Sequence, residues 1–412
     1  MNHPLEPFEI CHIRPPTENG SLTVRLTRNC GWNRCSFCPV YKRNAVFSRR
    51  TIDEVQEDID RISRIDDMLH EEGIIDASSQ AEAFKKVGEL IRRMDKGERK
   101  SPAPLDDDWF APWFKEELSL QDSIFHVLSW RLGGGETCFL GDADGLILST
   151  DFFTDVMARI KKSFPSVKRF TIYGRTVSAA RKPLEDLLAF REAGLHRIHF
   201  GLESGSDRVL SFMNKGETAE KHIQGCRKTR EAGLSCSVYI MPGLGGAEWS
   251  EEHALETARV INESSPDFIR LRTLEVFSGT PLKAAVLDGS FREASEEQVV
   301  SEIRLLIEAI ESDTIFYSDS ASNLLALNGL LPRDKEAMYR IIDQYLDLTD
   351  RGKLEFSLMA RLTSFQGQYG GLNQEIFTAL QPLIFGEQLN LAVASDNELD
   401  HLIRLIRAHL MP

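Results

Sequence analysis

Six short runs of apolar and β-branched residues alternate with segments of helical spacing along residues 21–274. This alternation is typical of β/α units, in which helices join parallel strands. The pentapeptide REAGL supports this interpretation, because at 191–195 and again at 230–234 it places a glycine between a helix and a strand. We therefore predict an α/β fold, with a parallel sheet curled into an open, partial (β/α)6 barrel. The predicted strands are 21–27, 136–140, 168–173, 197–202, 235–241 and 268–274, and the predicted helices are 51–72, 151–163, 183–193, 218–232 and 250–263.

Two parts of the chain depart from this alternation. Between the first two predicted strands lies a long segment, about 60–132, which we interpret as a helical insertion. It either covers the mouth of the barrel or forms a surface excursion with its own aromatic cluster. After residue 285 we expect no further strands, because segments 295–312 and 334–348 have helical apolar spacing. The predicted organisation is an N-terminal segment at 1–20, a partial barrel at 21–285 and a C-terminal helical region at 286–412.

The charge balance bears on the partners of the chain. It has 49 Lys and Arg against 63 Asp and Glu, which gives a formal net charge of −14. Proteins that bind extended nucleic acid do so largely through a basic surface, so we expect no nucleic-acid partner. No stretch approaches about eighteen consecutive apolar residues, and the first residues lack the basic-then-apolar layout of a signal peptide. We expect a cytoplasmic protein with no membrane partner.

Three of the seven cysteines lie within nine residues, as Cys30, Cys35 and Cys38 of LTRNCGWNRCSFCPVYK (26–42). An odd cysteine count with this clustering indicates metal binding rather than a disulfide framework. Three thiolates can ligate three irons of a [4Fe–4S] cluster and leave the fourth iron open. Two alternatives stay open: a structural zinc site, which normally needs a fourth ligand nearby, and three unrelated core cysteines. We expect the scattered thiols to be buried and inert, namely Cys138, Cys226 and Cys236.

This loop resembles the cysteine loop of the radical S-adenosylmethionine superfamily, and the resemblance covers about residues 20–285. The usual spacing there is three residues and then two, whereas here four residues, GWNR, separate the first pair. Phe37 is the aromatic residue expected before the last cysteine. The segment GLESGSDRVLSFMNKG (201–216) is similar to the fourth-strand segment of the branch with methylthiotransferases, the Elongator catalytic subunit and oxygen-independent coproporphyrinogen oxidase. In that branch, residues at the places of Glu203 and Lys215 contact S-adenosylmethionine and its carboxylate.

Two further segments are similar to cofactor-binding segments of the family. FLGDADGL (139–146) occupies the place of a glycine-rich turn that receives the methionine amino group, although the usual pattern there is Gly-Gly-Glu. YIMPGLGG (239–246) resembles the segment that lines the adenosine pocket, where some relatives carry an Asp in place of the tyrosine. The resemblance implies cofactor binding by Phe37, Gly141, Asp142, Glu203, Ser204, Lys215 and Tyr239, and a cluster held by Cys30, Cys35 and Cys38.

The resemblance implies a radical S-adenosylmethionine enzyme. Such an enzyme reductively cleaves S-adenosylmethionine at a [4Fe–4S] cluster to a 5′-deoxyadenosyl radical, which abstracts hydrogen from a substrate. The electron comes from a donor such as flavodoxin or ferredoxin, and we expect a small polar substrate, with no catalytic residue identified. A second hypothesis is a non-catalytic carrier of a cluster or haem on the same fold.

Residues on the polar faces of the predicted strands are candidates for binding the substrate, because side chains alternate along a strand. The arginines among them suit carboxylate or phosphate groups. The alternatives are ion pairs of the arginines with Glu203 or Glu275, and an ordinary core role for the histidine. The candidates are Arg25, His199, Arg270 and Arg272.

Overall fold

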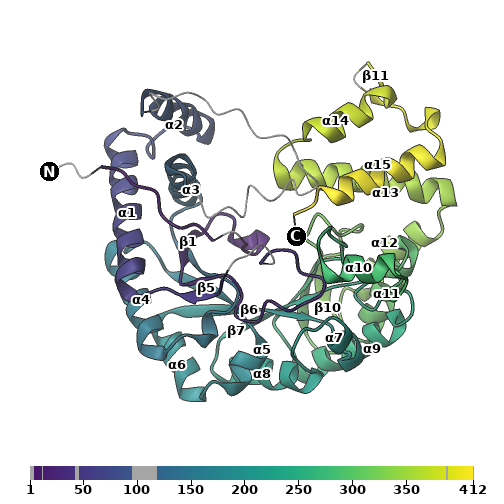
Figure 1. Cartoon of the computed structure of the whole chain (residues 1–412), viewed down its shortest axis with the longest axis horizontal. Helices are drawn as coiled ribbons and strands as arrows, with labels where there is room; N and C mark the ends of the chain where they lie inside the picture. The colour runs from purple at the N-terminus through teal and green to yellow at the C-terminus, as the bar shows by residue number, and fades with distance from the viewer. Residues whose placement is uncertain (1–3, 12, 42–45, 95–117, 387, 412) are drawn as a thin grey trace. The chain divides into compact units, whose positions relative to one another are not determined.

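The computed structural model describes residues 4–11, 13–41, 46–94, 118–386 and 388–411 (Figure 1). The chain divides into two compact units. The boundary falls within the cysteine loop, after Gly31, and again within β6, after His199. Unit 1 comprises Met1–Gly31, Asn44–His199 and Lys228–Ser235, and unit 2 comprises Trp32–Arg43, Phe200–Arg227 and Cys236–Pro412.

Eight strands follow one another in a sheet in the order β1-β4-β5-β6-β7-β8-β9-β10. β1 pairs in parallel with β4, and β4 with β5; in unit 2, β7 pairs in parallel with β8, and β8 with β9. Parallel strands joined by helices confirm the predicted α/β fold. The strands are β1 (Leu22–Arg25), β4 (Thr137–Gly141), β5 (Arg169–Gly174), β6 (Leu195–Glu203), β7 (Ser235–Ile240), β8 (Phe268–Leu271), β9 (Thr314–Tyr317) and β10 (Gly329–Leu331). Two short pairs lie apart, β2 (Thr27–Arg28) with β3 (Ser48–Arg49) and β11 (Ile384–Phe385) with β12 (Gln388–Leu389).

The helices of unit 1 form a packed layer in which α1 contacts α4 and α4 contacts α6. α1 begins with a capping box, since the Thr51 hydroxyl accepts from the Glu54 N–H and the Glu54 carboxylate accepts from the Thr51 N–H. α6 ends at Gly194, whose left-handed φ of +115° suits a residue without a Cβ. The helices are α1 (Ile52–Glu71), α2 (Gln80–Met94), α3 (Leu120–Leu132), α4 (Thr150–Ser163), α5 (Thr176–Arg181) and α6 (Leu184–Ala193).

The segment predicted as an insertion, 60–132, contains the end of α1 together with α2 and α3. Residues 95–117, with most of the bunched aromatic residues, lie outside the described part. α3 belongs to the core of unit 1, because it packs on α1 and β1 and because the Thr23 N–H donates to the His126 Nε2 at 2.9 Å. A role of the segment in covering a barrel mouth stays a prediction.

Unit 2 corrects the expectation that strands end by residue 285. β9 pairs in parallel with β8, and β10 pairs antiparallel with β9. These strands have four and three residues, too few for an apolar period to predict them, and they form through pairing of β9 with β8 and of β10 with β9. The helices that lie wholly or largely in this unit are α7 (Asp207–Phe212), α8 (Ala219–Glu231), α9 (Ser250–Ser264), α10 (Pro281–Leu287), α11 (Glu296–Ala309), α12 (Lys335–Leu346), α13 (Asp350–Tyr369), α14 (Gln374–Leu380) and α15 (Asp396–Ala408).

The last helices have an apolar core of their own. α13 packs on α15, and α14 also contacts α15. Their buried residues include Leu358, Phe365, Ile376, Leu399 and Ile406. Residues from about 350 onward therefore form a helical subregion within unit 2.

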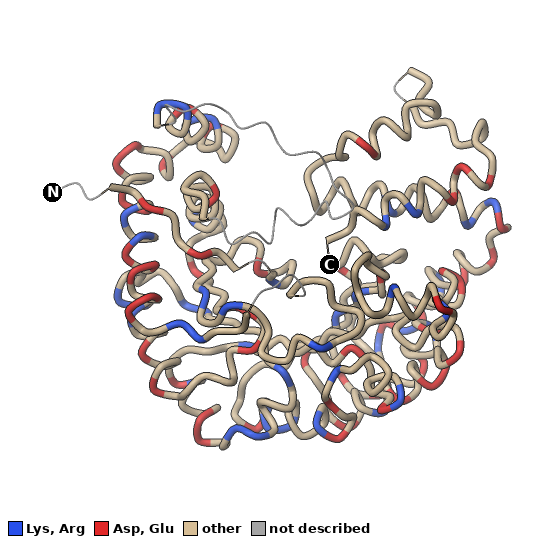
Figure 2. The backbone as a smooth tube through the Cα atoms, in the orientation of Figure 1, with Lys and Arg blue, Asp and Glu red and all other residues tan. Residues whose placement is uncertain are grey.

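Acidic and basic residues are interspersed along the helices, as α1 illustrates (Figure 2). Among the described residues, no helix has the length and apolarity to cross a membrane.

Candidate cofactor site

The residues predicted for the site are divided between the two units. All three clustered cysteines are partly exposed, and three such thiols on one short loop are a donor set that suits an iron–sulfur cluster. Within the described ranges, no group of three or more His, Cys, Asp or Glu side chains is already gathered around one metal position. The ligand assignment therefore remains a prediction from the loop sequence. Unit 1 holds Arg25, Cys30, Gly141, Asp142 and His199, and unit 2 holds Cys35, Phe37, Cys38, Glu203, Ser204, Lys215, Tyr239, Arg270 and Arg272.

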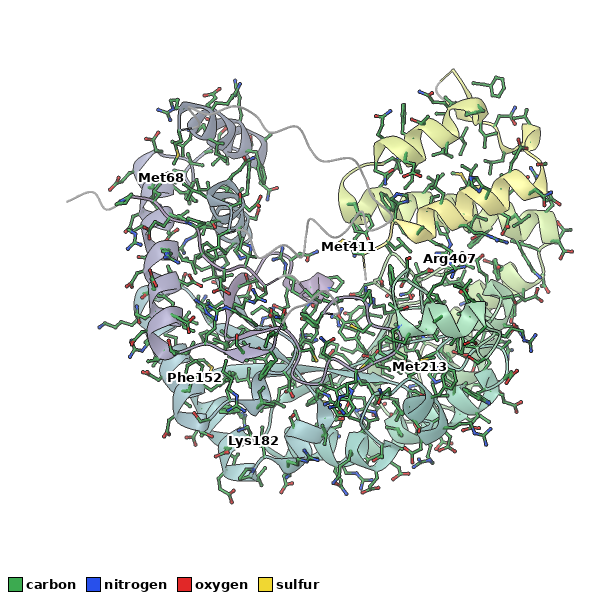
Figure 3. All side chains as sticks on the ribbon, viewed as in Figure 1. Met68, Phe152, Lys182, Met213, Arg407 and Met411 are labelled. Carbon is green, nitrogen blue, oxygen red and sulfur yellow. The ribbon has the colours of Figure 1, made fainter. Side chains whose placement is uncertain are left out.

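The second part of the cysteine loop is anchored between α7 and α10. The Ser36 N–H donates to the carbonyl of Met213 at 2.8 Å, and the Ser36 carbonyl accepts from the Leu282 N–H at 3.0 Å. Met213, which directly follows α7, is labelled in Figure 3. The Trp32 indole Nε1 donates to the carbonyl of Asn214 at 2.8 Å. Backbone and side-chain bonds thus tie this part of the loop to residues 213–214.

Phe37 is buried in an apolar cluster of unit 2. It packs with Val209, Met213 and Met241, and Cys35 and Cys38 lie against the same cluster. An apolar shell restricts the access of water to a metal site and tunes its redox potential. The contacts of Phe37 are therefore those of a residue that shields the two thiols, and direct contact with a cofactor stays a prediction.

Gly216 packs against the indole of Trp32 in the cysteine loop. Its φ is +69°, a left-handed conformation that favours glycine. A Cβ at this position would lie 2.2 Å from the Trp32 Cζ2 atom, far inside van der Waals contact. The indole and the glycine backbone therefore pack closely only because residue 216 has no side chain.

Glu203 and Lys215 form an ion pair next to this anchor. The Lys215 Nζ lies 3.3 Å from the Glu203 Oε1 and 3.9 Å from a Glu217 carboxylate oxygen. The Glu203 and Lys215 side chains are 13% and 9% exposed. Gly201 leaves room for the pair, since a Cβ there would lie 2.4 Å from the Glu203 Oε1 and 3.1 Å from the Lys215 Nζ. The segment similar to the family's fourth strand thus presents a largely buried carboxylate and ammonium side by side.

Ser204 does not face solvent but begins a buried polar network. Its hydroxyl lies 2.8 Å from the His253 Nδ1, and the His253 Nε2 lies 3.1 Å from the carbonyl of Met241. The Met241 N–H in turn donates to the Glu203 carbonyl at 3.0 Å. The network fixes the backbone after β6 to the backbone after β7, which is a positioning role.

Glu302 extends this network and was not identified from the sequence. Its carboxylate accepts from the Gly243 N–H at 2.8 Å and from the Ser250 hydroxyl, and it lies 3.6 Å from His253. Burial raises the pKa of Glu302 to about 7, and burial lowers the pKa of His253 to about 4. The sequence did contain a signal for Glu302, because this charged residue lies on the apolar face of α11 with Ile303 and Leu306, where a charge is unusual.

Asp142 in unit 1 has protein partners for its carboxylate. The Oδ2 atom accepts from the Arg25 Nε at 2.8 Å and from the Asn29 N–H at 3.0 Å. Arg25 is 3% exposed and Asp142 is 1% exposed, so this is a buried ion pair. Neighbouring Gly141 is packed against Cys11, whose Sγ would lie 2.2 Å from a Cβ at that position. These contacts hold β1 and β4 together, and binding of the methionine amino group by Gly141 and Asp142 stays a prediction.

His199 is fully buried beside Glu18. Its Nε2 lies 3.8 Å from the Glu18 Oε1. Burial would raise the pKa of Glu18, but the neighbouring His199, a hydrogen bond from Ser21 and the charge of Arg169 lower it overall. The contacts correspond to the core role considered for this histidine.

The strand arginines have partners other than the two glutamates considered. Arg270 donates to the carboxylate of Asp319, and the Arg272 Nη2 donates to the carbonyl of Met411 at 2.7 Å. Glu275 instead accepts from the Nε of Arg407, a residue of α15 labelled in Figure 3, at 2.8 Å. Arg270 thus forms a structural ion pair with a carboxylate other than Glu203 or Glu275, and a role of these arginines in binding the substrate stays a prediction.

The part of the chain that contains Asp142, Glu203 and Lys215 is similar to a known protein family. The family model described as "Radical SAM superfamily" matches residues 117–258. This range includes the segments with Asp142, Glu203 and Lys215 and begins after the cysteine loop. Residues 117–258 are thus similar to the radical S-adenosylmethionine superfamily, which the sequence segments predicted.

Individual relatives match parts of the chain. "Uncharacterized protein MJ0486" of Methanocaldococcus jannaschii is 24% identical over 140 residues, 34% of this chain and 43% of that protein. A tRNA-2-methylthio-N(6)-dimethylallyladenosine synthase of Bifidobacterium adolescentis is 39% identical over 72 residues, 17% of this chain and 15% of that protein. The chain therefore spans less than half the length of these curated relatives.

Among solved structures, the coproporphyrinogen III oxidase of Escherichia coli, a radical SAM enzyme, matches with a TM-score of 0.36 and 14% identity. The match covers 94% of this chain and 90% of that chain. A likeness at this level supports no conclusion about activity.

Proposed function

We propose that this chain is a radical S-adenosylmethionine enzyme in which Cys30, Cys35 and Cys38 hold a [4Fe–4S] cluster. The observation that carries the proposal lies within unit 2, where hydrogen bonds join the cysteine loop to the segment that contains Lys215 of the Glu203–Lys215 pair. The loop is bonded to the backbone of Met213 and Asn214, and Lys215 is the next residue. A short segment thus links two thiols to a largely buried ion pair of the kind that binds a zwitterionic cofactor.

When bound, the cluster and S-adenosylmethionine supply the reductive cleavage that yields a 5′-deoxyadenosyl radical for hydrogen abstraction. The residues of the chain bind and orient the cluster and S-adenosylmethionine. Lys215 presents a positive charge to the carboxylate of the methionine moiety, and Glu203 accepts hydrogen bonds beside it. Ser204, His253 and Glu302 hold the segments after β6 and β7 in place, and Phe37 shields the thiols. Lys in place of the commoner Arg keeps the charge and gives up the bidentate fork.

We propose a small polar substrate, an electron donor such as flavodoxin or ferredoxin, and a cytoplasmic location. The net charge of −14 favours a small molecule over extended nucleic acid. Two kinds of matching relative have names that refer to tRNA, so a tRNA substrate is the alternative that the experiment must separate. Three thiols clustered on one loop suit a reducing compartment.

The test is anaerobic reconstitution with iron and sulfide, followed by dithionite and S-adenosylmethionine. We expect about four irons per chain and formation of 5′-deoxyadenosine. Cys35→Ala and Cys38→Ala should lose the cluster, whereas Cys226→Ala, which removes a buried thiol of α8 in the same unit, should keep it. A full cluster in Cys35→Ala would contradict the ligand assignment. A stable cluster that never yields 5′-deoxyadenosine would contradict the enzyme and favour the carrier.

A further inference from the structure

One face of β7, β8 and β9 carries a row of polar and aromatic side chains within unit 2. The strand register aligns Tyr239 with Arg270, and Arg270 with Tyr317. Since side chains two residues apart share a face, Ser237 and Phe268 lie on the same face as this row. The face therefore joins a cation, two phenols, a hydroxyl and a phenyl ring over three adjacent strands.

Arg270 occupies the centre of this face and is 1% exposed. Its guanidinium carbon lies 5.3 Å from the centroid of the Tyr317 ring, and its Nη1 donates to the Asp319 carboxylate. Phe268 stacks on Tyr317, with ring centroids 6.3 Å apart and planes 9° from parallel. The guanidinium is thus held rigidly by an aromatic ring and one carboxylate oxygen.

Three polar atoms around this arrangement are buried without a hydrogen-bond partner in the described part of the chain. They are the Arg270 Nε, the Asp319 Oδ1 and the Ser237 Oγ. Leaving a buried polar atom without a partner is energetically costly, so such atoms normally have a ligand or ordered water as a partner. Two of the three belong to the same ion pair, and the third is a hydroxyl of the adjoining strand. The set offers an N–H donor, a carboxylate acceptor and a hydroxyl.

The charge balance limits what these atoms recognise. Arg270 and Asp319 together have no net charge, so a phosphate or other multiply charged anion would be repelled by Asp319. A molecule with a carboxylate and an adjacent ammonium matches both members of the pair. The partly exposed Phe268 and Tyr317 rings suit the apolar remainder of such a molecule.

We propose that this face binds a zwitterionic amino-carboxylate, with its carboxylate on the Arg270 Nε and its ammonium on the Asp319 Oδ1. The proposal rests on the proposed function in one respect, namely that this molecule is the substrate of the radical reaction. A structural link supports that assignment, because Tyr239 of the row lies two residues before Met241, which is bonded to the Glu203 carbonyl.

The experiment uses the full reconstituted chain and four sets of probes. These are pools of L-amino acids, the matching carboxylic acids without the amino group, inorganic phosphate, and an unmodified tRNA transcript. Binding is measured by thermal shift and by ligand-detected NMR. We expect binding from at least one amino-acid pool, and none from phosphate or from the carboxylic acids.

Two variants of the face test the assignment. Arg270→Gln and Asp319→Asn should each weaken binding by roughly tenfold or more, the loss expected for a charge-assisted hydrogen bond. Ser237→Ala leaves the ion pair intact and should weaken binding by a smaller factor, so the proposal stays testable if Arg270→Gln fails to fold. Arg304→Gln is the matched control, because Arg304 lies on the exposed side of α11, where it pairs with Asp343.

The outcomes separate this proposal from the proposed function. If no amino-acid pool binds, or if phosphate or tRNA binds in preference, the zwitterion site is wrong, even when dithionite still yields 5′-deoxyadenosine. If Arg270→Gln and Asp319→Asn weaken binding as expected but 5′-deoxyadenosine never forms, the site stands and the radical reaction does not. Equal affinities in all variants would overturn the assignment of these residues.

Discussion

Replacing Gly216 by alanine should loosen the cysteine loop at a cost that the structure allows us to estimate. The left-handed backbone, at φ +69°, costs an alanine about 1 kcal/mol. The new Cβ would also lie 2.2 Å from the Trp32 Cζ2 and 2.5 Å from two neighbouring ring atoms, so the indole must move. Its displacement breaks the 2.8 Å bond to the Asn214 carbonyl, which contributes about another 1 kcal/mol. We expect a total loss of about 2–3 kcal/mol when the lost ring packing is included.

Gly289→Ala is the matched control for this variant. Gly289 lies in the same unit with a similar φ of +80°, but a Cβ at this position would meet no other atom within 4 Å. It should therefore lose only the backbone contribution of about 1 kcal/mol. Urea unfolding of the apoprotein gives the two free energies, and iron content after reconstitution reports on the loop. Gly216→Ala should bind less iron than Gly289→Ala. Equal stability and equal iron content in the two variants would refute the idea that the Trp32 packing holds the loop in place.

Three further perturbations test other parts of the site. Burial raises the pKa of Glu302 from 4.5 to about 7, so the folded chain holds a proton on Glu302 that the unfolded chain releases; the contribution of Glu302 to the free energy of unfolding should therefore fall by about 3 kcal/mol as pH rises from about 4.5 to above 7. Glu302→Gln should remove this pH dependence from thermal melts, and an unchanged pH dependence in the variant would contradict the prediction. Asp142→Ala removes the nearer of the two carboxylates paired with the buried Arg25 and leaves only Glu9, at 3.3 Å, so it should cost about 3 kcal/mol, whereas the double change Arg25→Met with Asp142→Leu should recover much of it. Lys215→Ala should raise the KM for S-adenosylmethionine more than it lowers kcat, and Lys215→Arg should restore the KM; a selective loss of kcat would exclude a role in binding the carboxylate.

Most of the fold could be predicted because the hydrophobic periodicity of each strand and helix is visible in neighbouring residues. All six predicted strands and the helices between them lie within a few residues of the observed ones, as the helix predicted at 250–263 and observed at Ser250–Ser264 illustrates. The buried strands are short apolar runs, and each helix has an apolar face, so both signals are contained in neighbouring residues. β9 and β10 are different, since a run as short as TIFY forms a strand only through its pairing with β8.

Residues of the candidate site that share one segment lie close together. Glu203 and Lys215 are twelve residues apart and form an ion pair, whereas their expected contacts with S-adenosylmethionine stay a prediction. The partners of the strand arginines were not predictable, because Arg25 bonds Asp142, 117 positions away, and Arg270 bonds Asp319, 49 positions away. Long-range ion pairs depend on how strands align in space, and a single sequence does not carry that information.

The backbone at Glu203 gives a separate reason to regard this segment as functional. Its φ is +66°, and a non-glycine residue in this region costs of order 1 kcal/mol or more. The strain persists because the surroundings leave the segment no other conformation: the Glu203 carbonyl accepts from Met241, and the Gly205 N–H donates to the Thr257 hydroxyl at 2.8 Å. A Cβ at Gly205 would lie 2.3 Å from the Glu256 carbonyl oxygen, so α9 closes the remaining space. A carboxylate that served only to pair with Lys215 would need no strained backbone. A preorganised ligand-binding residue would account for this conformation, and binding of S-adenosylmethionine by Glu203 stays a prediction.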